Sequence, residues 1–449
     1  MVHTPLAAQA QQLTDHDPAV SSWLRRGGPA VLVVSLALYV VEYLQWPGYS
    51  MQIDVLVYRF GGTRVLDGLD LYSTGMWGRA DELLFTYTPF AALCFVPLAL
   101  LSRFWVEVLS LMASAGVLTY AVVRMLKWLG VSATHGLRGL AALLVGVMIW
   151  LEPVRQSVQL GQINLVILAV VIADVLSPPQ RRWAGVGLGV VAGIKLTPAI
   201  FIIYLLLIGR RRAALVATAT LSGTVAVGFA ILPTASVYYW LHGHFQDPRR
   251  INRDPSVSTS VSGLFERLHY PASLATVAAV ALALAGLAVG AVAHRRGRAL
   301  WGVAAVGLAS AAGSPFSWSH HWIWFTPLVV DLGHHAYVVG TRCAAWVMWL
   351  SSAVLAGWPT RLHGRSIRIG VVGMRPGGIW NQLLPSFYVL IFLILLAGTV
   401  TWRWLAGRDQ NLADPSYEAK TEGLVLRGSG KLRRPHPASG LVSRDGGIC

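Results

Sequence analysis

The chain has 449 residues, of which 55% are apolar and only 12% carry charge, far below the roughly 25% usual in soluble domains. This balance excludes an ordinary soluble protein and predicts an all-α polytopic membrane protein. The net charge of +16 does not indicate nucleic-acid binding, because the basic residues cluster where apolar runs end, as do the charges that fix membrane orientation. The three cysteines (Cys94, Cys343 and Cys449) have the spacing of neither a disulfide framework nor a metal site.

The apolar runs predict the membrane-spanning helices. Each covers roughly 15 to 26 residues, close to the ~20 that cross the hydrocarbon core as a helix, without the two-residue alternation of a β-barrel. They lie at about 30–46, 84–101, 104–126, 138–151, 162–176, 183–208, 213–233, 271–293, 299–313, 322–340, 343–358 and 379–404. Twelve plain spans would leave basic residues between 103 and 212 on the wrong side. We therefore expect a broken hairpin at 183–208, a similar irregularity within 84–126, and about 10 to 12 full crossings.

The two ends of the chain differ from this central part. Residues 1–28 are polar and lack the short apolar core and cleavage site of a secretory signal, so we predict a cytoplasmic segment followed by a retained anchor. The transmembrane domain is expected over 29–405, and 406–449 reads as a disordered cytoplasmic tail rich in Gly, Pro, Ser and charge. With the basic clusters inside a plasma (inner) membrane, four segments lie outside: 47–82, 234–270, 314–321 and 359–378.

The first outer loop, 47–82, opens on Asp54 directly after the first apolar run. Asp54 lies one helical turn before Tyr58, and the stretch around them could form a short helix along the membrane interface. A carboxylate there is a candidate general base. The alternative is that Asp54 only caps that helix by accepting backbone N–H bonds.

Polar residues also mark the start of the run at 162–176. Glu152 and Arg155 come shortly before two amides, Gln162 and Asn164. Amides buried at this position need partners, which either sugar hydroxyls or other helices could supply. These four residues are therefore candidates for substrate binding.

Lys195 lies about 12 residues from either end of an apolar segment, in the helix-breaking stretch Gly193-Ile194-Lys195-Leu196-Thr197-Pro198. A lone lysine at that depth is costly unless it is paired or lines a wet cavity, and it lies too far from the ends for snorkelling to explain it well. An anionic phosphate is the expected partner.

The last polar cluster is Ser317-Trp318-Ser319-His320-His321-Trp322, at the outer end of a short span. An imidazole of His320 or His321 could donate to a phosphate or orient a base, and Trp318 offers a flat face for a sugar ring. An interfacial aromatic belt is the alternative. Zinc is not expected, because adjacent histidines lack a matching ligand set.

The last candidates for substrate binding are arginines in the segments predicted to lie outside the membrane. Arg253 could help to stabilise an anionic leaving group. Four further arginines lie outside with no acid among them, and we expect them to face the phosphate of an anionic acceptor: Arg361, Arg365, Arg368 and Arg375.

Taken together, these residues resemble glycosyltransferase family 87. The likeness rests on Asp54, Gly161-Gln162-Ile163-Asn164, the stretch from Gly193 to Pro198, and Ser319-His320-His321, in this order over about residues 30–405. The resemblance implies a C-type membrane glycosyltransferase fold. It also implies an α-1,2-mannosyltransferase that takes mannose from polyprenyl-phosphate-mannose and extends phosphatidylinositol mannosides. Relatives in the family branch lipomannan or transfer arabinofuranose.

Many relatives carry Asn-Gln-Ser in the loop after the seventh span, where this chain has Ser258-Thr259-Ser260, so the acceptor can differ. The implied reaction is an inverting displacement. Asp54 takes the acceptor proton, while Lys195, a histidine of the pair and Arg253 stabilise the departing phosphate. This scheme needs no metal or other cofactor. A glycolipid transporter or flippase is the competing class, but no repeat between the two halves supports it.

Overall fold

The structure, a computed structural model, describes residues 18–45, 52–78, 83–131, 135–178, 180–246, 257–356, 359–362, 366–369 and 378–398. The chain forms two compact units, residues 1–392 and 393–449. Within the described residues, every element but one short hairpin is helical, which confirms the predicted all-α class.

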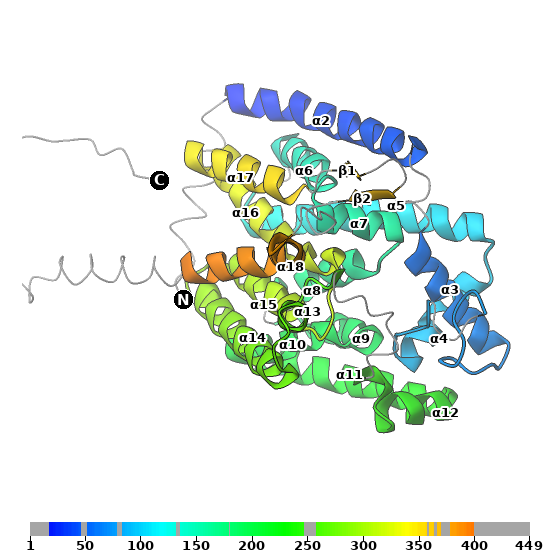
Figure 1. The fold of residues 1–449 in the computed structure, drawn as a ribbon. Helices are drawn as coiled ribbons and strands as arrows, with labels where there is room; N and C mark the ends of the chain where they lie inside the picture. Colours follow the sequence, from blue (N-terminus) through cyan, green and yellow to red (C-terminus); the bar gives the residue numbers. More distant parts are fainter. Residues whose placement is uncertain are drawn as a thin grey trace, which may run out of the picture. The chain divides into compact units, whose positions relative to one another are not determined.

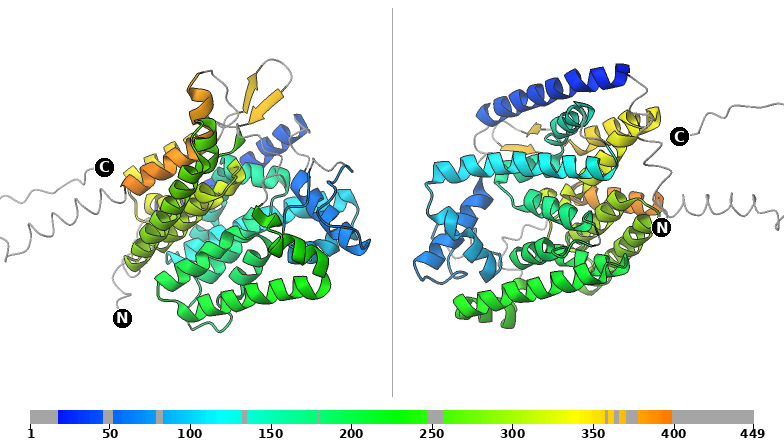
Figure 2. Two further views of the ribbon diagram at one scale, coloured as in Figure 1. Left: turned by 60° about the horizontal axis from the view of Figure 1, so that its bottom comes forward. Right: turned by 180° about the vertical axis from the view of Figure 1, so that it is seen from behind.

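Long apolar helices confirm that this is a multi-pass membrane protein. Five are long and apolar enough to cross a bilayer: Trp23–Val41 within α2 (Pro18–Gln45), α5 (Arg103–Trp128), α11 (Arg211–Ile231), α14 (Ala272–Arg295) and Trp380–Gly398. Helices α2, α5 and α11 have roughly parallel axes in Figure 1 and in the view from behind in Figure 2. Helix α2 begins well before the predicted run at 30–46, so Arg25 and Arg26 are part of the helix.

The remaining apolar runs form shorter or bent helices. Helices α6 (His135–Met148) and α7 (Glu152–Leu160) meet at a bend of 81° between residues 148 and 152, at the end of a run predicted to cross unbroken. With this pair counted as one span, the described residues contain up to six spans of full length, against the 10 to 12 expected. The difference lies in shorter apolar helices of 10 to 17 residues, which include α4 (Pro89–Ala99), α8 (Asn164–Val175), α15 (Ala299–Gly313) and α17 (Arg342–Leu355).

The predicted break at 183–208 is confirmed. Helix α9 (Val186–Ile194) ends at Lys195, whose backbone is extended (φ −139°, ψ 124°). A 3₁₀ turn, η2 (Thr197–Ala199), then leads into α10 (Ile200–Leu207). Pro198 explains the break, since it lacks the N–H that a continuous helix needs.

Several short elements connect the long helices. These are α3 (Ile53–Leu66), α12 (Pro233–Ser236), the π-helix η3 (Val237–Leu241), η4 (His244–Gln246), α13 (Val261–Arg267), η7 (Ser319–Phe325), α16 (Thr326–Tyr337), α18 (Trp380–Leu383) and η9 (Leu384–Ser386). The antiparallel hairpin pairs β1 (Pro359–Leu362) with β2 (Ser366–Ile369), with Pro359 opposite Ile369.

Helix α8 lies at the centre of the packed helices, and α3 and α4 form a cluster at one end. Residues on nearly every turn of α8 are buried. Helices α3 and α4 lie together beside one end of α5 (Figure 1), around an aromatic core that contains Tyr58, Phe85 and Phe95. Helix α2 packs closely on α6, where a Cβ on Gly28 would lie 1.9 Å from the Gly139 carbonyl oxygen, so only glycine fits.

Candidate functional site

Helix α3 presents Asp54 in its first turn. The helix start is fixed by Gln52, whose Nε2 donates to the carbonyl oxygens of Val158 (2.6 Å) and Gln159 (3.1 Å) at the end of α7. Gln52 occupies the N-cap position, and Asp54 is hydrogen-bonded to the side chain of Gln162. The capping explanation for Asp54 therefore receives no support from the contacts of its side chain.

Tyr58 and Tyr87 orient Gln162 toward that carboxylate. Their hydroxyls lie 2.9 Å apart and both reach the Gln162 Oε1, at 3.0 Å from Tyr58 and 3.4 Å from Tyr87. An amide oxygen accepts and the NH₂ donates, so the Gln162 Nε2 is the group that donates to Asp54. The backbone N–H of Ile163 in turn donates to the Tyr58 hydroxyl at 3.3 Å.

The turn between α7 and α8 carries both amides. Gly161 ends α7 in the left-handed region (φ 67°). A Cβ at this position would meet the Gln52 Oε1 and the Ser110 Oγ, each at 2.8 Å. Only glycine suits this tight turn, which sends the Gln162 side chain to Asp54 and leaves Asn164 to begin α8.

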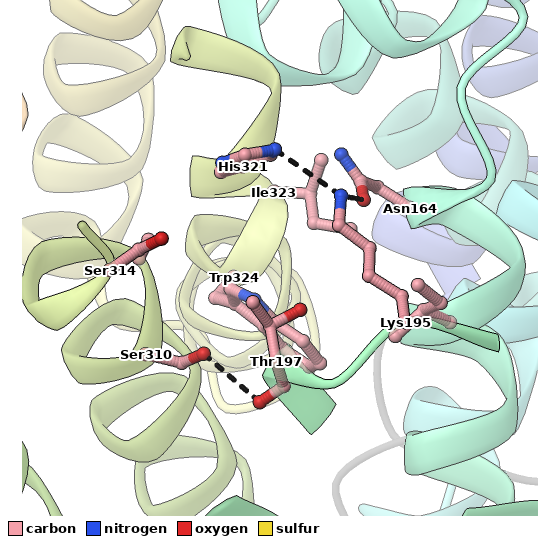
Figure 3. Close-up of a pocket in the computed structure, with 10 residues that line it drawn as sticks. Asn164, Lys195, Thr197, Ser310, Ser314, His321, Ile323 and Trp324 are labelled. Carbon is pink, nitrogen blue, oxygen red and sulfur yellow. Dashed lines mark hydrogen bonds between the residues drawn. The ribbon is translucent and has the colours of Figure 1, made fainter. Parts of the chain in front are cut away.

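Asn164 holds the predicted cation. The Lys195 Nζ donates to the Asn164 Oδ1 at 2.9 Å and lies 3.2 Å from the His321 Nε2, as Figure 3 shows. The Asn164 Nδ2 donates to the carbonyl oxygen of His320 at 2.9 Å, so α8 is also tied to η7. Two segments more than 120 residues apart in the sequence thus meet at one ammonium group.

The contacts of His321 assign its tautomer. The Ser317 hydroxyl donates to the Ala311 carbonyl oxygen at 2.6 Å, so its oxygen accepts from the His321 Nδ1–H at 3.3 Å. The Nε2 lone pair is then left to accept from Lys195. A neutral His321 therefore positions the lysine and leaves the positive charge on Nζ.

Burial changes the pKa values of Asp54 and His321 in opposite directions. Asp54 and His321 lie outside the candidate spans. Loss of hydration raises the pKa of Asp54 from 3.8 to about 6, while the Gln162 hydrogen bond and the positive charge of Lys195 oppose the rise. Burial and Lys195 lower the pKa of His321 well below its usual value. At neutral pH the site thus holds an ionised carboxylate able to take a proton, a neutral imidazole and one cation.

A small pocket of about 20 Å³ lies beside the cation. Its polar lining comes from Asn164, Lys195, Thr197, Ser310, Ser314 and His321, which Figure 3 labels. Ile323 and Trp324 supply apolar wall. Such a lining suits an anionic group attached to an apolar chain.

The other predicted residues of the η7 region flank this pocket. His320 is 4% exposed, lies parallel to the Trp318 ring at 5.7 Å, and has no hydrogen-bond partner on either ring nitrogen. His321, rather than His320, faces the pocket.

Glu152 and Arg155 lie away from the pocket lining, with only 1% and 2% of their surface exposed. The Tyr388 hydroxyl donates to the Glu152 Oε2 at 2.8 Å, and the Gln156 Nε2 donates to Oε1 at 3.4 Å. The Ser319 hydroxyl donates to the Gln156 Oε1. This buried network links α7 to η7 and to the last described helix.

Five predicted arginines cannot be placed in the site. Arg253, Arg365 and Arg375 lie outside the described residues, and only the backbones of Arg361 in β1 and Arg368 in β2 are described.

Several residues that build the site were not among its predicted members. Tyr87 and Ser317 bond to Gln162 and His321, and the Thr88 hydroxyl donates to the Gly193 carbonyl oxygen at 2.5 Å, next to the break that carries Lys195. The Thr88-Pro89 pair was a signal for a helix start, since Thr88 caps α4 by accepting from the Ala91 N–H. The described part of the chain holds no group of three or more His, Cys, Asp or Glu residues that could hold a metal ion.

Comparisons with known proteins identify the family of the chain. The profile of glycosyltransferase family 87 matches residues 85–317. The chain is 32% identical over 426 residues to the polyprenol-phosphate-mannose-dependent alpha-(1-2)-phosphatidylinositol mannoside mannosyltransferase of Mycobacterium tuberculosis, covering 87% of this chain and 96% of the relative. A protein of the same description from Mycolicibacterium smegmatis is 32% identical over 69% of this chain and 77% of its own length. The alpha-(1-2)-phosphatidylinositol pentamannoside mannosyltransferase of M. smegmatis is 31% identical over 85% of this chain and 92% of its own length. No solved structure matches the chain.

Proposed function

Because the chain belongs to glycosyltransferase family 87, we propose that it transfers mannose from polyprenyl-phosphate-mannose to a phosphatidylinositol mannoside in an α-1,2 link. The observation that carries this proposal is the placement of a base and a cation across one turn. Gln162 binds Asp54, and Asn164, two residues later, binds Lys195.

In this scheme the donor phosphate binds beside Lys195, in the pocket that Ser310 and Ser314 also line. Bond breaking between the mannose C1 and the phosphate oxygen leaves negative charge on the phosphate. Lys195 stabilises this charge, and Asn164 and His321 hold its ammonium in place. Polyprenyl phosphate departs as an anion and needs no proton at neutral pH.

The acceptor hydroxyl approaches C1 from the side of Asp54. Its oxygen forms the new bond while the carboxylate takes its proton, so a β-linked donor gives an α product in a single displacement. Glu152 acts indirectly in this scheme, because it binds Tyr388 and Gln156, and Gln156 in turn ties α7 to Ser319 of η7.

Reconstitution tests the proposal. Purified protein in lipid vesicles is incubated with polyprenyl-phosphate-mannose and either a tetramannoside or a pentamannoside of phosphatidylinositol, and products are analysed by mass and linkage. We expect one added α-1,2-mannose with the folded wild type. Transfer only from a polyprenyl-phosphate-arabinose donor, or only to a lipomannan, would replace the proposed substrates with those of other family members. Absence of any transfer, with lipid movement between leaflets, would support transport instead.

A further inference from the structure

A groove of about 320 Å³ lies along α3 and shares no lining residue with the Lys195 pocket. We call it the α3 groove. Its walls come from α3, the loop after it and the start of α5, and include Leu56, Arg59, Phe60, Met76, Trp77 and Arg103. Nothing in the reaction described above uses this surface.

Two arginines line the α3 groove. Arg59 donates through Nε to the Leu101 carbonyl oxygen at 3.0 Å, which fixes the plane of its guanidinium and directs its terminal nitrogens. Arg103 lies in the first turn of α5, is 65% exposed, and contacts Glu107 at 2.7 Å through Nε. No acid is among the described residues that line the groove. Two guanidinium groups, one of them at the positive end of a helix dipole, favour a phosphate.

The rest of the lining is apolar and aromatic. Trp77 is 55% exposed, and Leu56, Phe60 and Met76 complete a wall that a lipid glycerol or upper acyl chain can cover. Exposed tryptophan and arginine together are typical of the headgroup level of a bilayer. The groove therefore suits an anionic amphiphile better than a free phosphate ion.

The α3 groove and the candidate base share one helix. Arg59 follows Asp54 by five residues, which turns its side chain about 140° away and about 7.5 Å along the axis. A head group bound at Arg59 can thus reach Asp54 only around the start of α3, and an oligosaccharide extending from a lipid is long enough to do so.

We propose that the α3 groove binds the phosphodiester of the glycolipid acceptor, with Arg59 and Arg103 on the phosphate and Trp77 against its lipid. This inference rests on the proposed function. It gives the α3 helix two tasks, to hold the acceptor by its phosphate and to present the base to its terminal sugar.

The test compares Arg59→Gln, Arg103→Gln and the double variant with wild type. Arg212→Gln, which removes an exposed charge at the start of α11, is the matched control. We expect each groove variant to raise the KM for phosphatidylinositol mannoside about tenfold, the double variant more, and kcat and the donor KM to stay unchanged. The KM for an uncharged alkyl oligomannoside with the same sugars should not change in any variant.

Several outcomes would overturn the inference. The proposed contact with the phosphate would be contradicted by an unchanged acceptor KM in the double variant. An equal rise in the KM of the uncharged acceptor would contradict it as well. A larger effect from Arg361→Gln/Arg368→Gln would assign the phosphate to the arginines of the hairpin instead. Full competition by phosphatidylglycerol would make the groove a site for any anionic phospholipid.

Direct binding separates failure of this site from failure of the proposed function. Native mass spectrometry of the detergent-solubilised protein counts bound phosphatidylinositol mannoside without any transfer. If the wild type retains phosphatidylinositol mannoside and the double variant loses it, the groove is supported as its binding site, even if the protein catalyses a different reaction. Equal retention by both contradicts it.

Discussion

Asp54 has a role that can be tested apart from its effect on folding. Asp54→Asn keeps the shape and the Gln162 contact but cannot accept a proton, so kcat should fall by about 10²- to 10⁴-fold. Because burial raises the pKa of Asp54, removal of its charge should leave the melting temperature unchanged or raise it. Mass-resolved transfer assays and thermal unfolding in detergent measure the two effects. Asp67→Asn, an exposed acid at the end of the same helix, is the control and should retain activity.

The raised pKa of Asp54 also predicts a pH profile. The base acts only when ionised, so kcat should rise with pH through a midpoint near 6 and level off about one pH unit higher. Stability should change in the opposite direction. The folded protein binds the Asp54 proton more tightly than the unfolded chain, so its contribution to stability decreases between about pH 4 and 6. A kcat that is flat from pH 5 to 8 in the wild type would contradict Asp54 as the base.

Lys195 should affect the leaving group and leave the acceptor unaffected. Lys195→Gln retains a donor to Asn164 but loses the charge, so we expect kcat to fall by about 10²- to 10³-fold with little change in the acceptor KM. Lys127→Gln, at the exposed end of α5, should behave like wild type. A donor analogue with a better leaving group should be less sensitive to Lys195→Gln. Equal loss with both donors would argue that the lysine has only a structural role.

At the scale of elements, the turn between α7 and α8 matters most. It carries Gln162, which contacts Asp54, and is followed by Asn164, which binds Lys195. Gly161→Ala places a Cβ 2.8 Å from two side-chain oxygens at a positive φ, so it should destabilise the fold by roughly 1 to 3 kcal/mol and lower activity further than the change in stability explains. Gly116→Ala, in an open part of α5, should be neutral or stabilising. Measurements of thermal unfolding and of kcat for both variants test this prediction.

Local patterns explain which parts of the site could be predicted. Asp54, Lys195 and the two amides stand out because each places a polar group beside or within apolar sequence, and Gly193 and Pro198 mark the break around the lysine. The Glu152 contact with Tyr388 could not be predicted, since it joins residues 236 positions apart. The 81° bend between α6 and α7 does have a local signal in Pro153, because proline suits the first turn of a helix and disfavours continuation of the preceding one.

At the scale of the whole molecule, charge separates two ends of the bundle. Arg210 donates to the carbonyl oxygens of Asp174 (3.0 Å) and Val175 (2.6 Å) at the end of α8, and Arg295 donates to that of Leu207 at 3.1 Å. The basic turns after α10 and α14 therefore lie together at one end of α8. Asn164 and the site lie at its other end, about 16 Å away along the helix axis.

From the positive-inside rule we expect the site on the extracytoplasmic side, and labelling can test this orientation. In a background with Cys94, Cys343 and Cys449 replaced, single cysteines are introduced as Ser73→Cys, in the exposed loop after α3, and Arg296→Cys, in the exposed turn after α14. A membrane-impermeant maleimide added to intact cells should modify position 73, and should modify position 296 only after the membrane is opened. The reverse pattern would place Asp54 in the cytoplasm and require a donor that presents its sugar there. Because the two positions mark opposite ends of the same bundle, labelling of only one in intact cells fixes the orientation of the whole protein.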